Sequence, residues 1–114
     1  MEVADSQGRT PLHIACRTEN TTVVRVLLKT GASVSSVTLG ELQSPLHYAA
    51  RHDAAEVIDM LVEHGAEVNP VDYKGRTPLL LAAELDRSVA ALKLLDLDAK
   101  AGIIDKTGEV AFIS

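Results

Sequence analysis

Apolar and polar residues follow a repeating pattern along the chain. A Thr-Pro-Leu or Ser-Pro-Leu motif opens a largely apolar stretch at residues 10, 44 and 77, so the motif recurs after 34 and then 33 residues. The hydroxyl residue can cap a helix by accepting a hydrogen bond from a free backbone amide, and proline has no amide to leave unpaired at the first helical position. The pattern therefore predicts helices that start at Pro11, Pro45 and Pro78.

A second apolar segment follows each of these helices after a short break. The segments are residues 23–28, 57–62 and 90–95, and their apolar spacing predicts a second helix in each copy. Gly31 and Gly65 come shortly after the first two segments, where a helix end favours a residue with positive φ. A helix-loop-helix unit of this size cannot bury its own apolar face, so we expect the copies to stack and share one core.

Composition narrows the kind of core and the kind of ligand. The chain has 114 residues, of which 46% are hydrophobic and 3% aromatic, so we expect one domain with a core of Leu, Val, Ile and Ala. A formal net charge of -5 opposes the phosphate neutralisation on which nucleic-acid binding depends. We therefore predict that the chain does not bind nucleic acid.

The sequence also indicates the cellular compartment of the protein. The sequence has one cysteine, Cys16, no signal-peptide pattern, and no apolar run of the roughly 20 residues that cross a bilayer. We expect an intracellular, cytoplasmic location and no direct insertion into a membrane.

The segments of each copy combine in an order that resembles a known family. Gly-x-Thr-Pro-Leu-His-x-Ala-Ala, then a Val-Val-x-x-Leu-Leu helix, then Gly-Ala-x-Val is similar to the ankyrin repeat, and the likeness covers nearly the whole chain. The resemblance implies an all-α solenoid of helix-loop-helix units joined by β-hairpin-like loops, with the first helices lining a concave side. We expect one ankyrin repeat domain over residues 1–114, flanked by further repeats in a longer parent protein. Its repeats are expected at about 5–37, 38–71 and 72–104, with a partial one at 105–114.

The copies differ at two places that bear on function. The second hairpin is one residue longer than the third and has the sequence Thr-Leu-Gly-Glu-Leu in place of an Asp-x-x-Gly turn. We expect a bulged hairpin, either a loose loop or a binding element with Leu39 and Leu42 as contacts. In the third copy Leu80 stands where the others have His13 and His47. The resemblance implies that this histidine bonds the Thr hydroxyl and nearby backbone, so one polar contact between repeats should be missing.

No catalytic, cofactor or metal site is predicted. Cys16 and His13 are three residues apart on one predicted helix, but Cys16 holds a position that is alanine in the other copies, which favours buried packing. His47 and His52 are five residues apart and do not share a helix face as metal ligands would. The glycines recur as turn residues, and none belongs to a phosphate-binding motif. We predict that this segment is not an enzyme.

Function is expected at the positions that the repeat does not dictate. On the first helices, the side predicted to face the concave surface carries Ile14, Arg17, Thr18, Tyr48, Arg51, His52, Leu81, Glu84 and Leu85. The hairpin tips add Gln7, Arg9, Leu42, Gln43, Tyr73, Lys74 and Arg76. Tyr and Arg are enriched at binding hot spots, so the first candidates for contacts of a protein partner are Tyr48, Arg51, Tyr73 and Arg76. Two interpretations stay open: partner contacts, or ordinary solvated residues and contacts to other domains of a parent protein.

The resemblance also implies a modification site. Asn69, with Leu61 eight residues before it, is similar to the hairpin asparagine that can be hydroxylated in ankyrin repeats, although Glu67 stands where aspartate is commoner. We hypothesise that an asparaginyl hydroxylase modifies Asn69.

Three functions are compatible with these residues. The first is a non-catalytic protein-protein interaction scaffold that presents a preorganised concave surface to a protein partner. The second is the cytosolic ankyrin array of a membrane channel, because residues 75–83 are similar to runs in transient-receptor-potential channels. The third is a regulatory or targeting arm of an enzyme, such as a ubiquitin-ligase adaptor or a kinase.

Overall fold

The computed structural model describes residues 4–18, 20–97, 102–104 and 110–112, the last two segments by their backbone. These residues form six helices and one two-stranded sheet. The helices are α1 (Pro11–Thr18), α2 (Thr21–Lys29), α3 (Pro45–Arg51), α4 (Ala55–Glu63), α5 (Pro78–Glu84) and α6 (Ser88–Asp96). The strands β1 (Gly102–Ile104) and β2 (Val110–Phe112) pair in antiparallel register, with Gly102 opposite Phe112.

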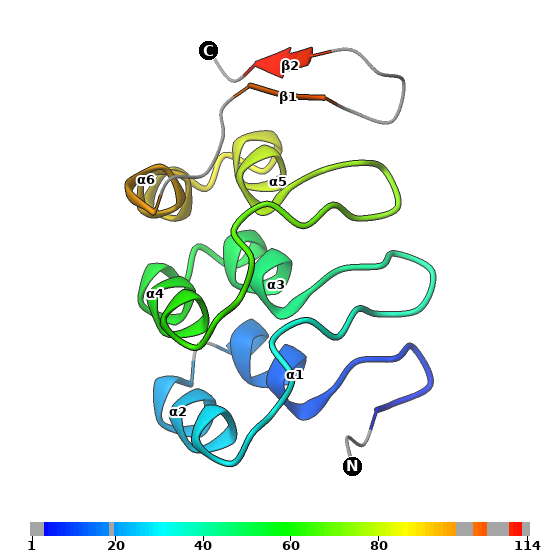
Figure 1. Ribbon diagram of the computed structural model, residues 1–114, viewed down its shortest axis with the longest axis vertical. Coiled ribbons are helices and arrows are strands. Elements are labelled where there is room, and N and C mark those ends of the chain that lie inside the picture. Colours follow the sequence, from blue (N-terminus) through cyan, green and yellow to red (C-terminus); the bar gives the residue numbers. More distant parts are fainter. Residues whose placement is uncertain (1–3, 19, 98–101, 105–109, 113–114) are drawn as a thin grey trace.

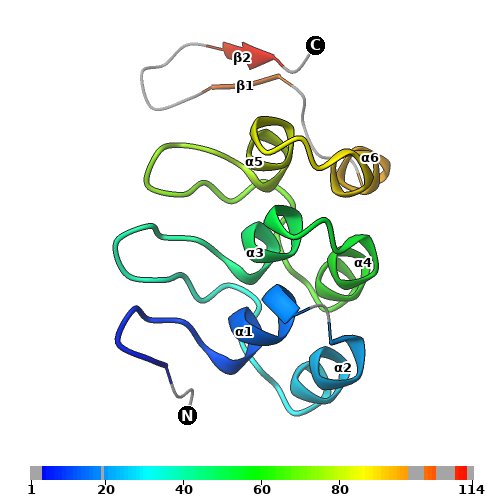
Figure 2. The same cartoon turned by 180° about the vertical axis from the view of Figure 1, so that it is seen from behind.

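The helices stack in two columns. In Figure 1, α1, α3 and α5 lie above one another in one column and α2, α4 and α6 in the other, while the segments that precede the first column project sideways as hairpins. Figure 2 shows the same two columns and the same projecting hairpins from behind. Each copy of the sequence pattern contributes one helix to each column. The predicted all-α solenoid of helix-loop-helix units is confirmed.

Each helix of the first column starts where the sequence predicts. Pro11, Pro45 and Pro78 are the first residues of α1, α3 and α5. Ser44 Oγ accepts a hydrogen bond from the amide of His47, and Thr77 Oγ1 accepts one from the amide of Leu80. These caps satisfy donors that have no partner inside the helix, which fixes the helix start.

The hydrophobic core lies partly within each repeat and partly between neighbouring repeats. Leu12, Leu46 and Leu79 hold equivalent positions in the first column and are fully buried. The second column buries Val24, Val57, Ile58, Leu61, Ala90 and Leu94. Burying one such leucine contributes about 1.5–3 kcal/mol, so a core to which every copy contributes is the main source of stability.

Two buried histidines join each repeat to the next. The amide of Thr10 donates to His13 Nδ1, so Nε2 carries the ring proton and donates to the carbonyl oxygen of Gln43 at 2.8 Å. His47 makes the same bond to the carbonyl oxygen of Arg76, also at 2.8 Å. Leu80 holds the equivalent position in α5, and its side chain has no nitrogen with which to make such a bond.

The hairpins are closed turns that contact one another through their backbones. The first hairpin (residues 4–10), the second (37–44) and the third (71–77) are closed by backbone hydrogen bonds such as Thr38 N to Gln43 O, at 3.0 Å. The amide of Leu39 donates to Gln7 O at 2.8 Å, and the amide of Tyr73 donates to Glu41 O at 3.0 Å. The second hairpin is therefore a bonded turn rather than a loose loop.

The described chain ends in a pair of strands and not in a further pair of helices. Most of the predicted partial repeat at residues 105–114 lies outside the described residues, apart from β2. Figure 1 shows the β1-β2 pair beyond α5, on the side where a further hairpin would follow the third. Among the helices in the described part of the chain, none is long and apolar enough to span a bilayer.

Candidate partner-binding surface

Most of the predicted contact residues on the first helices reach the surface, but two do not. Arg17, Thr18, Glu84 and Leu85 are exposed, and Arg51 and His52 are partly exposed. The side chains of Tyr48 and Leu81 are only 4% and 2% exposed. A partner on this face cannot contact these two side chains to any useful extent, so we remove them from the proposed contacts.

The burial of Tyr48 has a clear physical cause. Its ring meets the ring of His13, in the preceding repeat, edge to face at a centroid distance of 5.0 Å. The position is therefore part of the stacking interface between repeats, and not of the concave surface as predicted. Ile14 holds the same position in α1 and is exposed, because no described repeat precedes it.

A network of polar side chains runs across the second and third repeats. The buried carboxylate of Asp72 accepts hydrogen bonds from the amides of Lys74 and Arg76, both at 2.9 Å. Its second oxygen accepts from Gln43 Nε2 at 3.1 Å and from Arg76 Nε at 3.0 Å. Burial by itself would raise the pKa of Asp72, but these hydrogen bonds together outweigh it and hold the pKa below its usual value.

The predicted contacts Arg51, Arg76 and Glu84 belong to this network. Arg51 Nη1 donates to Gln43 Oε1 at 3.0 Å, and its guanidinium carbon lies 5.4 Å from the centre of the Tyr48 ring. Arg76 Nη1 donates to Glu84 Oε1 at 2.9 Å. Side chains that are already bonded within the protein lose little conformational freedom when a partner arrives, so this network favours a preorganised surface.

The remaining predicted contacts lie at the hairpin tips. We use the name tip surface for Leu39, Leu42, Tyr73 and Lys74, on the second and third hairpins. Leu39, Leu42 and Tyr73 are 66%, 45% and 41% exposed, and Lys74 Nζ lies 5.6 Å from the centre of the Tyr73 ring. The hydrogen bond from Tyr73 N to Glu41 O holds the two tips side by side.

The backbone of the second hairpin is strained at Leu42. Its φ is 55°, in the left-handed region, where Gly8 and Gly75 stand in the other two hairpins. A left-handed conformation costs a residue with a side chain roughly 1–2 kcal/mol, and strain of this kind concentrates at functional sites. The extra residue in the hairpin was the signal in the sequence that this turn differs from the others.

The other candidate side chains have structural roles. Cys16 is completely buried, and burial raises the pKa of its thiol to about 12, so it is a packing residue without thiolate character at neutral pH. In the part of the chain that the structure describes, no three His, Cys, Asp or Glu side chains come together as a metal site would require. Asn69 is partly buried in the segment that leads from α4 to the third hairpin, and its hydroxylation stays a prediction.

The fold and this surface define a helical repeat protein that exposes a structured set of hairpin tips. A sequence model described as "Ankyrin repeats (3 copies)" matches residues 36–105, and one described as "Ankyrin repeat" matches residues 7–39. The chain therefore belongs to the ankyrin repeat family. Ankyrin repeats are generally protein-protein interaction modules and are typically non-catalytic. A search of curated proteins found no match to the chain.

Proposed function

We propose that the chain binds a protein partner through the tip surface, together with the exposed polar side chains of the first helices. At the tips the contacts are Leu39, Leu42, Tyr73 and Lys74. The first helices add Arg17, Arg51, His52 and Glu84, and the third hairpin adds Arg76. Ile14 extends this set at the first repeat. The segment acts by binding and catalyses no reaction, and we place this activity in the cytoplasm.

One observation carries the proposal. Two large apolar side chains and one tyrosine are exposed on neighbouring hairpins whose backbones are bonded to each other, and one of them, Leu42, is held there against a conformational cost. A surface that is fixed before binding loses little entropy on association, and aromatic side chains are enriched among binding hot spots. The ordinary alternative, that these are isolated solvated residues, does not explain a leucine kept at a position where glycine serves in the other hairpins.

Affinity capture with matched variants tests the proposal. Leu42→Gly removes the side chain but keeps a residue that favours the left-handed backbone, so the hairpin should stay intact. Tyr73→Ala removes the second contact. Leu92→Ala, on the exposed side of α6 away from the hairpins, is the control. A partner that binds the unmodified chain and the control, and binds both tip variants at least about tenfold more weakly, would support the tip surface. Equal binding to all four proteins would refute it.

A further inference from the structure

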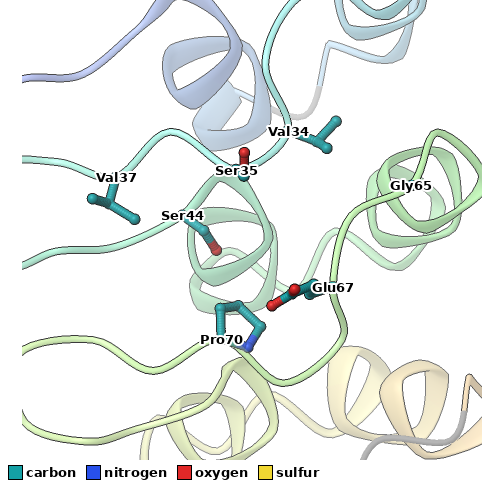
Figure 3. Close-up of a pocket in the computed structure, with 7 residues that line it drawn as sticks. All are labelled: Val34, Ser35, Val37, Ser44, Gly65, Glu67 and Pro70. Atoms are coloured by element: carbon teal, nitrogen blue, oxygen red, sulfur yellow. The ribbon is translucent and has the colours of Figure 1, made fainter.

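A second surface lies away from the hairpin tips, where the chain passes from one repeat to the next. A cleft of about 330 Å³ opens there between residues 34–37 and residues 65–70. We use the name linker cleft for it. Its lining residues are Val34, Ser35, Val37, Ser44, Gly65, Glu67 and Pro70 (Figure 3). The volume is at the small end of the range for ligand sites, roughly 300–1,000 Å³, so it suits a single long side chain of a partner.

The lining has an apolar part and one charged group. Val34, Val37 and Pro70 supply the apolar part, and Glu67 is the one ionisable residue among those that line the cleft. Figure 3 shows the Glu67 side chain turned toward Pro70 and Ser44 across the cleft. The Ser44 hydroxyl is already bonded to His47 Nδ1 at 3.0 Å, so it offers little to a ligand.

The carboxylate of Glu67 is available for an external partner. It is exposed, and the four ion pairs found among the described residues do not include it. The equivalent residue of the first repeat is Ser33, so of the first two repeats only the second carries an acid at this position. A chain with a net charge of -5 also favours a basic partner.

We propose that the linker cleft receives a lysine side chain of a protein partner. The four-carbon stem would lie against Val34, Val37 and Pro70, and the ammonium group would reach the Glu67 carboxylate, as amphipathic lysines bury their stems and keep their charge at a polar rim. Lysine fits better than arginine, because the cleft offers one free carboxylate, whereas a guanidinium brings five N–H donors that need partners. This surface is separate from the tip surface, so either proposal can fail without the other.

The test is a titration of the isotopically labelled protein with three short peptides, followed by amide chemical shifts. The peptides are acetyl-Ala-X-Ala-amide, with lysine, arginine or norleucine at X. We expect saturable shifts at Val37, Gly65 and Glu67 with the lysine peptide, and weaker binding with arginine. With norleucine we expect an affinity about two- to fivefold lower than with lysine. Norleucine keeps the apolar stem and lacks the charge, so it isolates the contribution of the carboxylate.

A matched pair of variants tests the role of Glu67. Glu67→Gln should weaken binding of the lysine peptide about two- to fivefold, the range expected for a solvent-accessible ion pair. Glu63→Gln removes the same charge from an exposed residue of α4 that does not line the cleft, and should leave the affinity unchanged. The proposal is overturned if lysine gives no saturable shifts, if norleucine or arginine binds as well as lysine, or if both variants weaken binding equally.

Discussion

Truncating His47 should remove a large share of the stability of the chain. The ring is fully buried, its Nδ1 accepts from the amide of Ser44 at 3.1 Å, and its Nε2 bonds the carbonyl oxygen of Arg76 at 2.8 Å. His47→Ala leaves both backbone groups without that partner, at about 1–3 kcal/mol each, and opens a cavity in the stacking interface. Water that enters the cavity would replace part of the lost hydrogen bonding. We therefore expect the free energy of unfolding, about 5–15 kcal/mol for a typical domain, to fall by about 3 kcal/mol.

Urea denaturation followed by circular dichroism measures this loss. His64→Ala is the control, because His64 is exposed at the end of α4 and should contribute less than about 1 kcal/mol. Should His47→Ala not fold, His47→Leu keeps most of the volume and copies the residue found at Leu80, so it isolates the polar contacts and should cost about 1–3 kcal/mol. A loss below about 1 kcal/mol for the alanine variant would refute the role of this histidine in joining the repeats.

Three further predictions concern His47, Gly8 and Asp72. Burial lowers the pKa of His47 below its ordinary value, so the neutral ring is favoured in the folded state and stability should fall as the pH drops below about 6.5. His47→Leu should reduce this fall in stability, and an equal fall in both proteins would contradict the prediction. Gly8→Ala should cost more than about 2 kcal/mol, because a Cβ there would lie 2.8 Å from Leu39 N. Gly40→Ala has a similar φ but open space around it, so it should cost only about 1 kcal/mol. Equal losses of stability in thermal unfolding would refute the close approach of Leu39 to Gly8. Asp72→Asn should cost about 2–3 kcal/mol in urea denaturation, since it loses charged hydrogen bonds from Gln43 and Arg76. The same change at the exposed Asp5 should cost less, and the reverse order would contradict the network.

The parts of the fold that depend on neighbouring residues could be predicted from the sequence. Pro11, Pro45 and Pro78 start helices because a cap and a proline act within a few residues of each other. The repetition of these signals then determined the order of the helices. The buried packing of Cys16 followed in the same way, from its equivalence to alanines in the other copies.

The parts that depend on how one repeat sits on the next could not be predicted. Tyr48 and Leu81 were assigned to the concave surface, but both are buried, and the Tyr48 ring packs against His13 of the preceding repeat. The hydrogen bond from Gln43 to Asp72, and the close approach of Leu39 to Gly8, join residues about 30 positions apart, so no local pattern reveals them. The linker cleft was missed for the same reason, since its two sides come from successive repeats.

Amide hydrogen exchange at Leu39 and Tyr73 tests most directly whether the tip surface is formed before any partner binds. Both residues have exposed side chains, yet their amides donate to Gln7 O and Glu41 O on the neighbouring hairpins. If the hairpins are bonded to one another in the free protein, both amides should exchange at least about tenfold more slowly than in an unstructured peptide. Exchange of both amides at the rate of an unstructured peptide would show that the hairpins are independent loops and would contradict a preorganised binding surface.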